Sequence, residues 1–226
     1  MALLEGLSGE FWPIHPKPYD DELLSSWIVR LARAYGVEPT KFWRQSSPDP
    51  IDLQWPVLDY LPPEKLLSVL SKATATPPQR VLETTLLAVG SVQFIPRMNA
   101  LLRYCPMCLS EDPEPYFRRE WQMSAFRLCD RHNCLICCHC RQCRRPQSVY
   151  KIPLEAEFIS CCFHCGADLR QQPPIVKTDV MMIQEWQLRF WGCVREVPPD
   201  LSRASHWQIV RAKNGLRRYS LGTRRN

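Results

Sequence analysis

Four short pairs of cysteine and histidine constrain what this chain can fold into more than any other feature of its sequence. Each pair has two residues between its members, and zinc binds such pairs because one tight turn presents both ligands. Twenty residues separate the first two pairs and eighteen the last two. The spacing predicts two tetrahedral zinc sites. Their ligands would be Cys105, Cys108, Cys129 and His132 in the first site and Cys140, Cys143, Cys162 and Cys165 in the second.

The cellular compartment decides how the 12 cysteines are interpreted. Eleven of them lie in residues 104–169. The first residues show no basic stretch followed by an apolar core, so they do not resemble a signal peptide. No apolar run of about 18 residues occurs, so we expect neither a membrane span nor a membrane partner. A cytoplasmic location follows, where closely spaced thiols bind metal more often than they form disulfides. Disulfide pairing is the alternative.

Several thiols and imidazoles fall outside the two predicted sets. Cys137 and Cys140 also have C-x2-C spacing, which leaves the ligand register of the second site open. We prefer Cys140 with Cys143, because pairing Cys137 with Cys140 would leave Cys143 without a partner. Surplus cysteines behave as small apolar side chains or exposed thiols. The residues left over are Cys134, Cys137, Cys138, Cys161 and Cys193, with His139 and His164.

Both predicted zinc sites are closed by four protein ligands, whereas a catalytic zinc keeps one position for water. The sequence contains no H-E-x-x-H, no zinc-deaminase signature, no Walker A loop and no G-x-S-x-G. We therefore predict two structural Zn²⁺ ions, no catalytic residues and no enzymatic activity.

Residues 10–103 contain no cysteine and show helical patterns. Apolar residues at i, i+3 and i+4 spacing predict a helix over 21–35, capped by Asp20 and ended by Gly36. A short helix over 38–43 would follow, and the two are compatible with a helix-turn-helix. A plain helical bundle without a DNA role has the same pattern. Further helices are predicted from Pro62-Pro63-Glu64 and, with Thr76 as the cap, from Pro77-Pro78 to about Leu87.

Composition agrees with a helical fold. The chain is 45% hydrophobic and has 21 prolines but only 8 glycines, which favours short helices ended by proline turns over a large sheet. Another apolar helix is predicted over 178–191. We expect a mainly α fold with small zinc-ribbon β elements. Its three parts would be an N-terminal helical, helix-turn-helix-like domain (10–103), a tandem zinc-finger domain (104–170), and a C-terminal helical segment with a basic tail (171–226).

The net charge of +6 is concentrated near the C-terminal end, where residues 201–226 carry seven basic side chains and no acidic one. Such a tail suits a polyanion, and phosphate contacts position a protein on DNA without reading its sequence. A solvated tail without a partner is the alternative. The predicted nucleic-acid contacts are Arg203, Arg211, Lys213, Arg217, Arg218, Arg224 and Arg225.

Several segments in combination resemble the TniQ/TnsD family of transposition target-selection proteins. They are PYDDELLSSWIVRLA from Pro18, YCPMCL from Tyr104, YFRREW from Tyr116, and the four ligand pairs. The resemblance covers about residues 10–170 and implies the same two ligand sets as the spacing. The chain departs from the family at Asp130, where proline is usual, and in the crowded cysteines between Cys134 and Cys138.

The resemblance implies an adaptor that links a target-DNA complex to an AAA+ transposition regulator of the TnsC/TniB type, which recruits the transposase. About 57 residues follow Leu169, so the chain is similar to the short TniQ type, some of which accompany CRISPR effectors. There, guide pairing supplies sequence recognition. The partners implied are the AAA+ regulator, a CRISPR effector complex, the DNA backbone, and a second copy of the chain, since some relatives are dimers.

Two other functions compete with the adaptor. A TnsD-like protein would read a DNA site itself through Arg, Asn or Gln on a recognition helix, and Gln79 with Arg80, or Arg30 with Arg33, are the candidates. A zinc-stabilised interaction module would contact no DNA. The aromatic residues that could meet a partner, although core packing is the favoured interpretation, are Trp43, Trp55 and Phe94.

Overall fold

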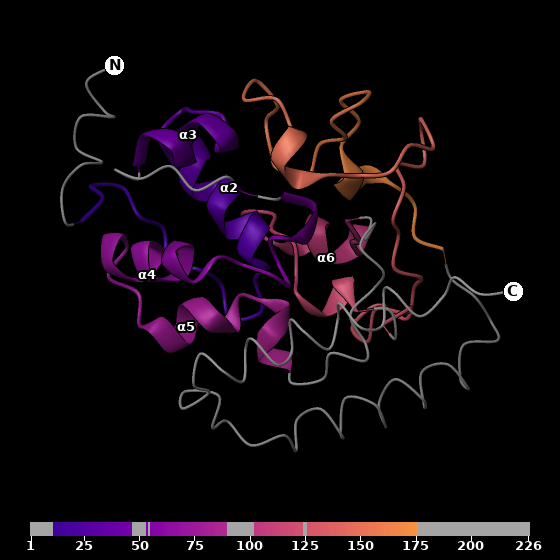
Figure 1. The fold of residues 1–226 in the computed structure, drawn as a ribbon. Coiled ribbons are helices and arrows are strands. Elements are labelled where there is room, and N and C mark those ends of the chain that lie inside the picture. The colour runs from indigo at the N-terminus through magenta and orange to yellow at the C-terminus, as the bar shows by residue number, and fades with distance from the viewer. Residues whose placement is uncertain (1–10, 47–52, 54, 90–101, 124–125, 176–226) are drawn as a thin grey trace, which may run out of the picture.

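The computed structural model describes residues 11–46, 53, 55–89, 102–123 and 126–175. This part of the chain is mainly helical, and its β pairing consists of isolated antiparallel bridges in place of the expected small strands. Helices α2 to α5 lie on one side of the molecule, and the turns of residues 126–175 lie beyond α6 (Figure 1). The predicted helix over 178–191 and the basic tail lie outside the described residues. The helices are α2 (Leu24–Ala34), α3 (Pro39–Ser46), α4 (Glu64–Ala73), α5 (Pro78–Glu83) and α6 (Pro106–Glu111), with 3-10 turns at Trp55–Val57, Leu86–Val89, Glu120–Gln122, Val149–Lys151 and Leu169–Gln171.

Helix α2 ends where the sequence predicts. Gly36 has a φ of 64°, which glycine adopts without a steric penalty. The N–H groups of Gly36 and Val37 donate to the carbonyls of Arg33 and Ala32, and this is the Schellman arrangement that ends a helix. The Gly36 stop is thus confirmed.

The predicted start of α2 at residue 21 is wrong. The helix begins at Leu24, and its N-cap residue, Leu23, makes no side-chain capping bond. The backbone N–H of Leu24 instead donates to the Thr84 carbonyl, so a tertiary contact satisfies one of the donors that a cap would serve. Asp20, the predicted cap, pairs with Arg80 at 2.8 Å.

Helix α4 begins at Glu64 after Pro63, as predicted, but α5 is shorter than expected. Its N-cap is Pro77, not Thr76, and it ends at Glu83. The Thr84 and Thr85 hydroxyls donate to carbonyls of the preceding turn at 2.7 Å, and such back-bonding competes with a continuing helix.

Buried charges join two segments that lie far apart in the sequence. Arg118 is only 3% exposed, and its guanidinium binds the Asp112 carboxylate through two bonds of 2.9 and 2.7 Å. Its Nε lies 2.9 Å from Asp21 Oδ2, and its Cζ lies 4.4 and 4.9 Å from the ring centroids of Tyr116 and Trp121. The charge of Arg118 is therefore compensated within a core where an unpaired charge would be costly.

A second buried pair lies beside the first. Arg30 on α2 donates to Glu22 at 2.7 Å and to Glu114 at 2.8 Å. Burial raises the pKa of Glu22 to about 7, against the opposing charge of Arg30. The Leu23 N–H also donates to the Phe117 carbonyl. One hydrophobic core thus continues across residue 103, and the division into three domains stays a prediction.

Replacing Arg118 by alanine tests how much the fold depends on this network. Because Asp112 and Asp21 would lose a buried partner, we expect Arg118→Ala to lower the free energy of unfolding by about 3–5 kcal/mol. The matched control is Arg80→Ala, whose partner Asp20 is fully exposed, and it should cost less than about 1 kcal/mol. Urea unfolding of the metal-loaded proteins measures both, and equal losses would contradict the expectation.

Candidate metal centres

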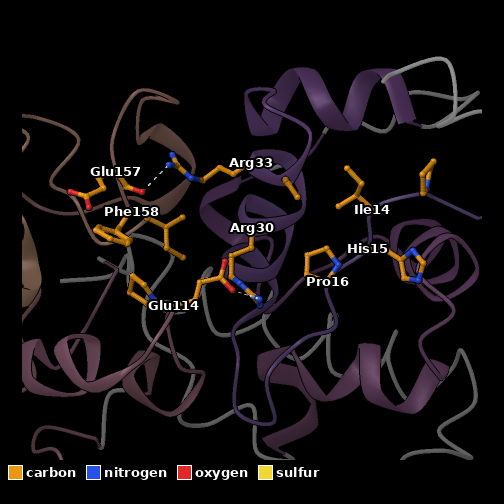
Figure 2. Close-up of a pocket in the computed structure, with 12 residues that line it drawn as sticks. Ile14, His15, Pro16, Arg30, Arg33, Glu114, Glu157 and Phe158 are labelled. Atoms are coloured by element: carbon orange, nitrogen blue, oxygen red, sulfur yellow. Dashed lines mark hydrogen bonds and ion pairs between the residues drawn. The ribbon is translucent and has the colours of Figure 1, made fainter. Parts of the chain in front are cut away.

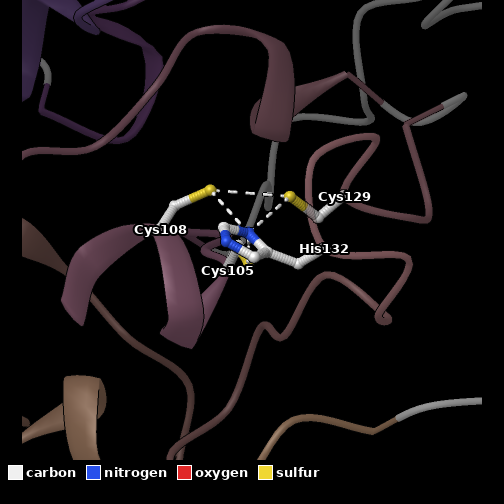
Figure 3. A group of neighbouring side chains, drawn as sticks. All are labelled: Cys105, Cys108, Cys129 and His132. Atoms are coloured by element: carbon white, nitrogen blue, oxygen red, sulfur yellow. Dashed lines mark hydrogen bonds between the residues drawn. The ribbon is translucent and has the colours of Figure 1, made fainter. Parts of the chain in front are cut away.

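The first centre gathers two ligands from a helix and two from a turn. Cys105 is the N-cap of α6 and Cys108 lies in its first turn, while Cys129 and His132 come from the turn that follows residue 128. Figure 3 shows the four side chains converging. The Cys108 and Cys129 sulfurs are 3.5 Å apart, and His132 Nδ1 lies 3.6, 3.3 and 3.4 Å from the sulfurs of Cys105, Cys108 and Cys129.

These distances fit a tetrahedral metal ion. Zinc–sulfur bonds of about 2.3 Å place two sulfur ligands about 3.8 Å apart, and the shorter zinc–nitrogen bond brings nitrogen to about 3.5 Å from sulfur. The four ligand atoms all lie within 4.8 Å of one another. The first cluster could therefore hold a metal ion without rearrangement of its backbone.

Glu111 orients the imidazole of the first centre. Its Oε1 lies 2.8 Å from His132 Nε2, so Nε2 carries the proton and Nδ1 presents its lone pair to the cysteines. Glu111 is the last residue of α6, three positions after Cys108, and residues at that spacing share a helix face. Sequence analysis missed this residue, although the i, i+3 spacing from a predicted ligand was a usable signal.

The second centre brings together Cys140, Cys143, Cys162 and Cys165. The Cys140 and Cys165 sulfurs are 3.8 Å apart and those of Cys143 and Cys162 are 3.7 Å apart, close to the tetrahedral spacing. The Cys137 sulfur lies near the Leu135 carbonyl instead. The structure thus adopts the preferred register, with Cys143 in the set and Cys137 outside it.

Two buried glutamines donate to the second centre. Gln147 Nε2 lies 3.4 Å from Cys162 Sγ, and Gln172 Nε2 lies 3.2 Å from Cys140 Sγ. Although burial opposes ionisation of Cys162, backbone N–H groups of Cys165 and His164 and the Gln147 amide together lower the pKa of its thiol to about 7. These donors favour the thiolate that a metal requires. No pattern in the sequence pointed to the two glutamines.

The same turn geometry presents three of the four ligand pairs. The N–H of the residue after the second ligand donates to the carbonyl of the first ligand, and the N–H of the first ligand donates to the carbonyl two residues beyond the second. The residue after the second ligand has a positive φ each time: 50° at Asn133, 60° at Arg144 and 74° at Gly166. Glycine and asparagine favour this conformation, whereas arginine does not. We call these turns the first, second and third knuckles.

A fifth thiol touches the first centre. Cys134 is fully buried, and its sulfur lies 3.5 Å from that of Cys105, although it is not one of the four grouped ligands. Cys137 and Cys161 are buried, and Cys138 lies 3.0 Å from His139 Nδ1. The surplus cysteines of the described region thus serve mainly as small buried side chains, while Cys193 lies outside it.

The arginines proposed to read DNA bases are engaged within the protein. Arg30 and Arg33 line a pocket of about 700 Å³ between α2 and residues 157–159 (Figure 2). Arg33 Nη1 donates to the Pro153 carbonyl at 3.1 Å, and Arg30 binds Glu22 and Glu114. On α5, Gln79 and Arg80 both contact Glu83.

The other residues predicted to be functional either are buried or lie outside the described region. Trp43 and Trp55 belong to the hydrophobic core, in line with the favoured interpretation. Phe94 and the seven basic residues of the tail lie in undescribed parts of the chain. Among the described helices, none has the length and apolar character needed to span a bilayer.

Comparison with known proteins identifies one family. The family model described as TniQ matches residues 13–136, which is more than half of the chain and includes all four ligands of the first centre. The match ends before Cys140, so the second centre rests on its geometry alone. A comparison with curated proteins gives no match.

Removing the carboxylate of Glu111 should weaken the first centre. Partners that orient a histidine ligand contribute about 10–100-fold in metal affinity, so we expect Glu111→Ala to lower the Zn²⁺ affinity of one of two sites by that factor. Competition with a chromophoric chelator measures it. Glu155→Ala, at an exposed glutamate outside both clusters, is the control, and an unchanged affinity in Glu111→Ala would contradict the assignment.

Opposite substitutions at two equivalent knuckle positions should have different effects on stability. Gly166→Ala places a side chain where φ is 74°, and we expect the free energy of unfolding to fall by about 1–2 kcal/mol. Arg144→Gly relieves the same conformation and should leave stability unchanged or raise it by up to about 1 kcal/mol. Urea unfolding with metal bound tests both, and a comparable loss in each would refute the argument.

Proposed function

The chain belongs to the TniQ family, and from this premise we propose that it is a transposition adaptor linking a target-DNA complex to an AAA+ regulator. TniQ proteins have a role in transposition target selection, so the general role follows from family membership. The adaptor role, the partners and the identity of the metal are our proposal.

The observation that carries the proposal is the closed form of both clusters. Each offers four protein ligands, and a tetrahedral ion bound by four such ligands keeps no position for a substrate or water. Thiolate-rich tetrahedral sets favour zinc among the divalent metals available to proteins. We therefore assign two structural Zn²⁺ ions and a non-enzymatic role in which the metals hold a surface in shape.

The contacts of the candidate base-reading arginines within the chain favour an adaptor over a protein that reads DNA by itself. Arg30, Arg33 and Arg80, the candidates for base recognition, all bind carboxylates or carbonyls of the chain. A readout residue must offer its donors to a base edge. We propose that sequence recognition comes from a partner, such as a CRISPR effector complex, and that this chain contributes contact to the DNA backbone. A homodimer and an AAA+ regulator of the TnsC/TniB type complete the proposed partners.

A binding experiment tests the proposal. Zinc-loaded protein is captured with a candidate AAA+ regulator of the TnsC/TniB type, and fluorescence anisotropy compares random duplexes with the attachment region over a salt series. We expect regulator binding that is lost on chelation of zinc, and DNA binding that ignores sequence and weakens steeply with salt. Tight binding to one duplex that persists at physiological salt would instead favour the TnsD-like function. Unchanged regulator binding after complete zinc removal would contradict the structural role of the metals.

A further inference from the structure

The second and third knuckles gather basic side chains on one surface. Arg144 and Arg145 follow Cys143 in the second knuckle, and both are exposed, as is Lys151. Arg145 Nη1 lies 3.3 Å from Nδ1 of His164 in the third knuckle. Lys151 Nζ lies 5.6 Å from the ring centroid of Phe163, which itself lies 3.8 Å from that of His164. We call Arg144, Arg145, Lys151 and His164 the basic knuckle surface.

The positive charge of this surface has no compensating carboxylate in the described part of the chain. No ion pair there involves Arg144, Arg145 or Lys151, whereas Arg131 beside the first knuckle pairs with Glu111 at 3.3 Å. The Nδ1 of His164 accepts from Arg145, so this imidazole supplies no negative charge. Three exposed cations therefore have no carboxylate partner among the described residues.

The backbone conformation of Arg144 suggests that its side chain has a role. Arg144 has a φ of 60°, where the other two knuckles have asparagine and glycine. A long side chain in this region is strained, and strain of this kind is typical of positions kept for function. Replacement by glycine would relieve the strain but remove one charge from the basic knuckle surface.

We propose that the basic knuckle surface binds the phosphate backbone of duplex DNA. Arginine and lysine side chains are usual phosphate contacts. Single strands are held by base stacking on open aromatic rings, but the Phe163 ring already packs against His164 at a tilt of 36°, and Tyr150 is stacked on Trp55. The choice of DNA rests on the proposed function, while the surface itself lies beyond residues 13–136 that match the family.

The test measures duplex binding by the full, zinc-loaded chain. A triple variant, Arg144→Ala with Arg145→Ala and Lys151→Ala, is compared with wild type by fluorescence anisotropy on a random duplex from 50 to 200 mM salt. We expect at least roughly tenfold weaker binding at low salt, and a salt slope smaller by about 3, since each lost phosphate contact contributes about 0.9. The control variant replaces Lys41, Arg44 and Lys72 by alanine, which removes the same charge from α3 and α4, and it should bind within about twofold of wild type.

A single variant separates the effect of the lost charge on DNA binding from an effect on folding. Arg144→Gly should reduce the salt slope by about 1 while its melting temperature stays equal to or above that of wild type, which excludes misfolding as the cause. Wild-type affinity in the triple variant, an equal loss in the control variant, or a preference of the surface for single strands or RNA over duplex DNA would each overturn the inference.

Regulator capture keeps this inference distinct from the proposed function. If the triple variant loses duplex binding but still captures the AAA+ regulator, both stand. If it loses neither, the inference fails and the adaptor function stands. If wild type never captures the regulator yet the triple variant alone loses DNA binding, the adaptor function fails and the basic knuckle surface stands.

Discussion

The buried guanidinium of Arg118 is the interaction on which the rest of the structure depends. It binds Asp112, the C-cap residue of α6, and Asp21, which precedes α2. Since α6 carries Cys105, Cys108 and Glu111, this one side chain sets the position of half of the first metal centre relative to the N-terminal helices. Apolar packing alone would be less directional, because hydrophobic burial does not fix orientation whereas a bidentate arginine–carboxylate pair does.

The two metal centres are connected through Tyr104 and Gln172. Tyr104 precedes the first ligand, and its backbone exchanges hydrogen bonds with Cys137. Its hydroxyl lies 2.8 Å from Gln172 Oε1, and the amide nitrogen of the same Gln172 donates to Cys140 in the second centre. Each centre thus helps to orient the other. The pair is better regarded as one metal-stabilised unit than as two independent fingers.

The sequence predicted which side chains group in the two candidate metal centres better than it predicted where the helices begin. Ligand identity depends on spacing within one tight turn, so all eight grouped residues and the preferred register of the second centre followed from local pattern. The end of α2 at Gly36 was also predicted from a local pattern. Two helix starts were wrong. At α2 a tertiary acceptor, the Thr84 carbonyl, takes the place of the predicted cap Asp20, and at α5 the N-cap is Pro77 and not Thr76. The roles of Gln147 and Gln172 depend on tertiary contacts that no local pattern predicts, whereas Glu111 had a local signal in its spacing from Cys108. The basic knuckle surface likewise depends on contacts between residues 144–151 and 163–164, which are apart in the sequence.

The buried network also constrains the order in which parts of the protein can fold during synthesis. Asp21 and α2 leave the ribosome long before Arg118, the partner that compensates the Asp21 charge. At about 5–20 residues per second, the interval is roughly 5–20 s. The Asp21 carboxylate therefore lacks this partner until the segment around Arg118 has been made. Zinc can complete the first centre only later still, because Cys129 and His132 follow Arg118 in the chain.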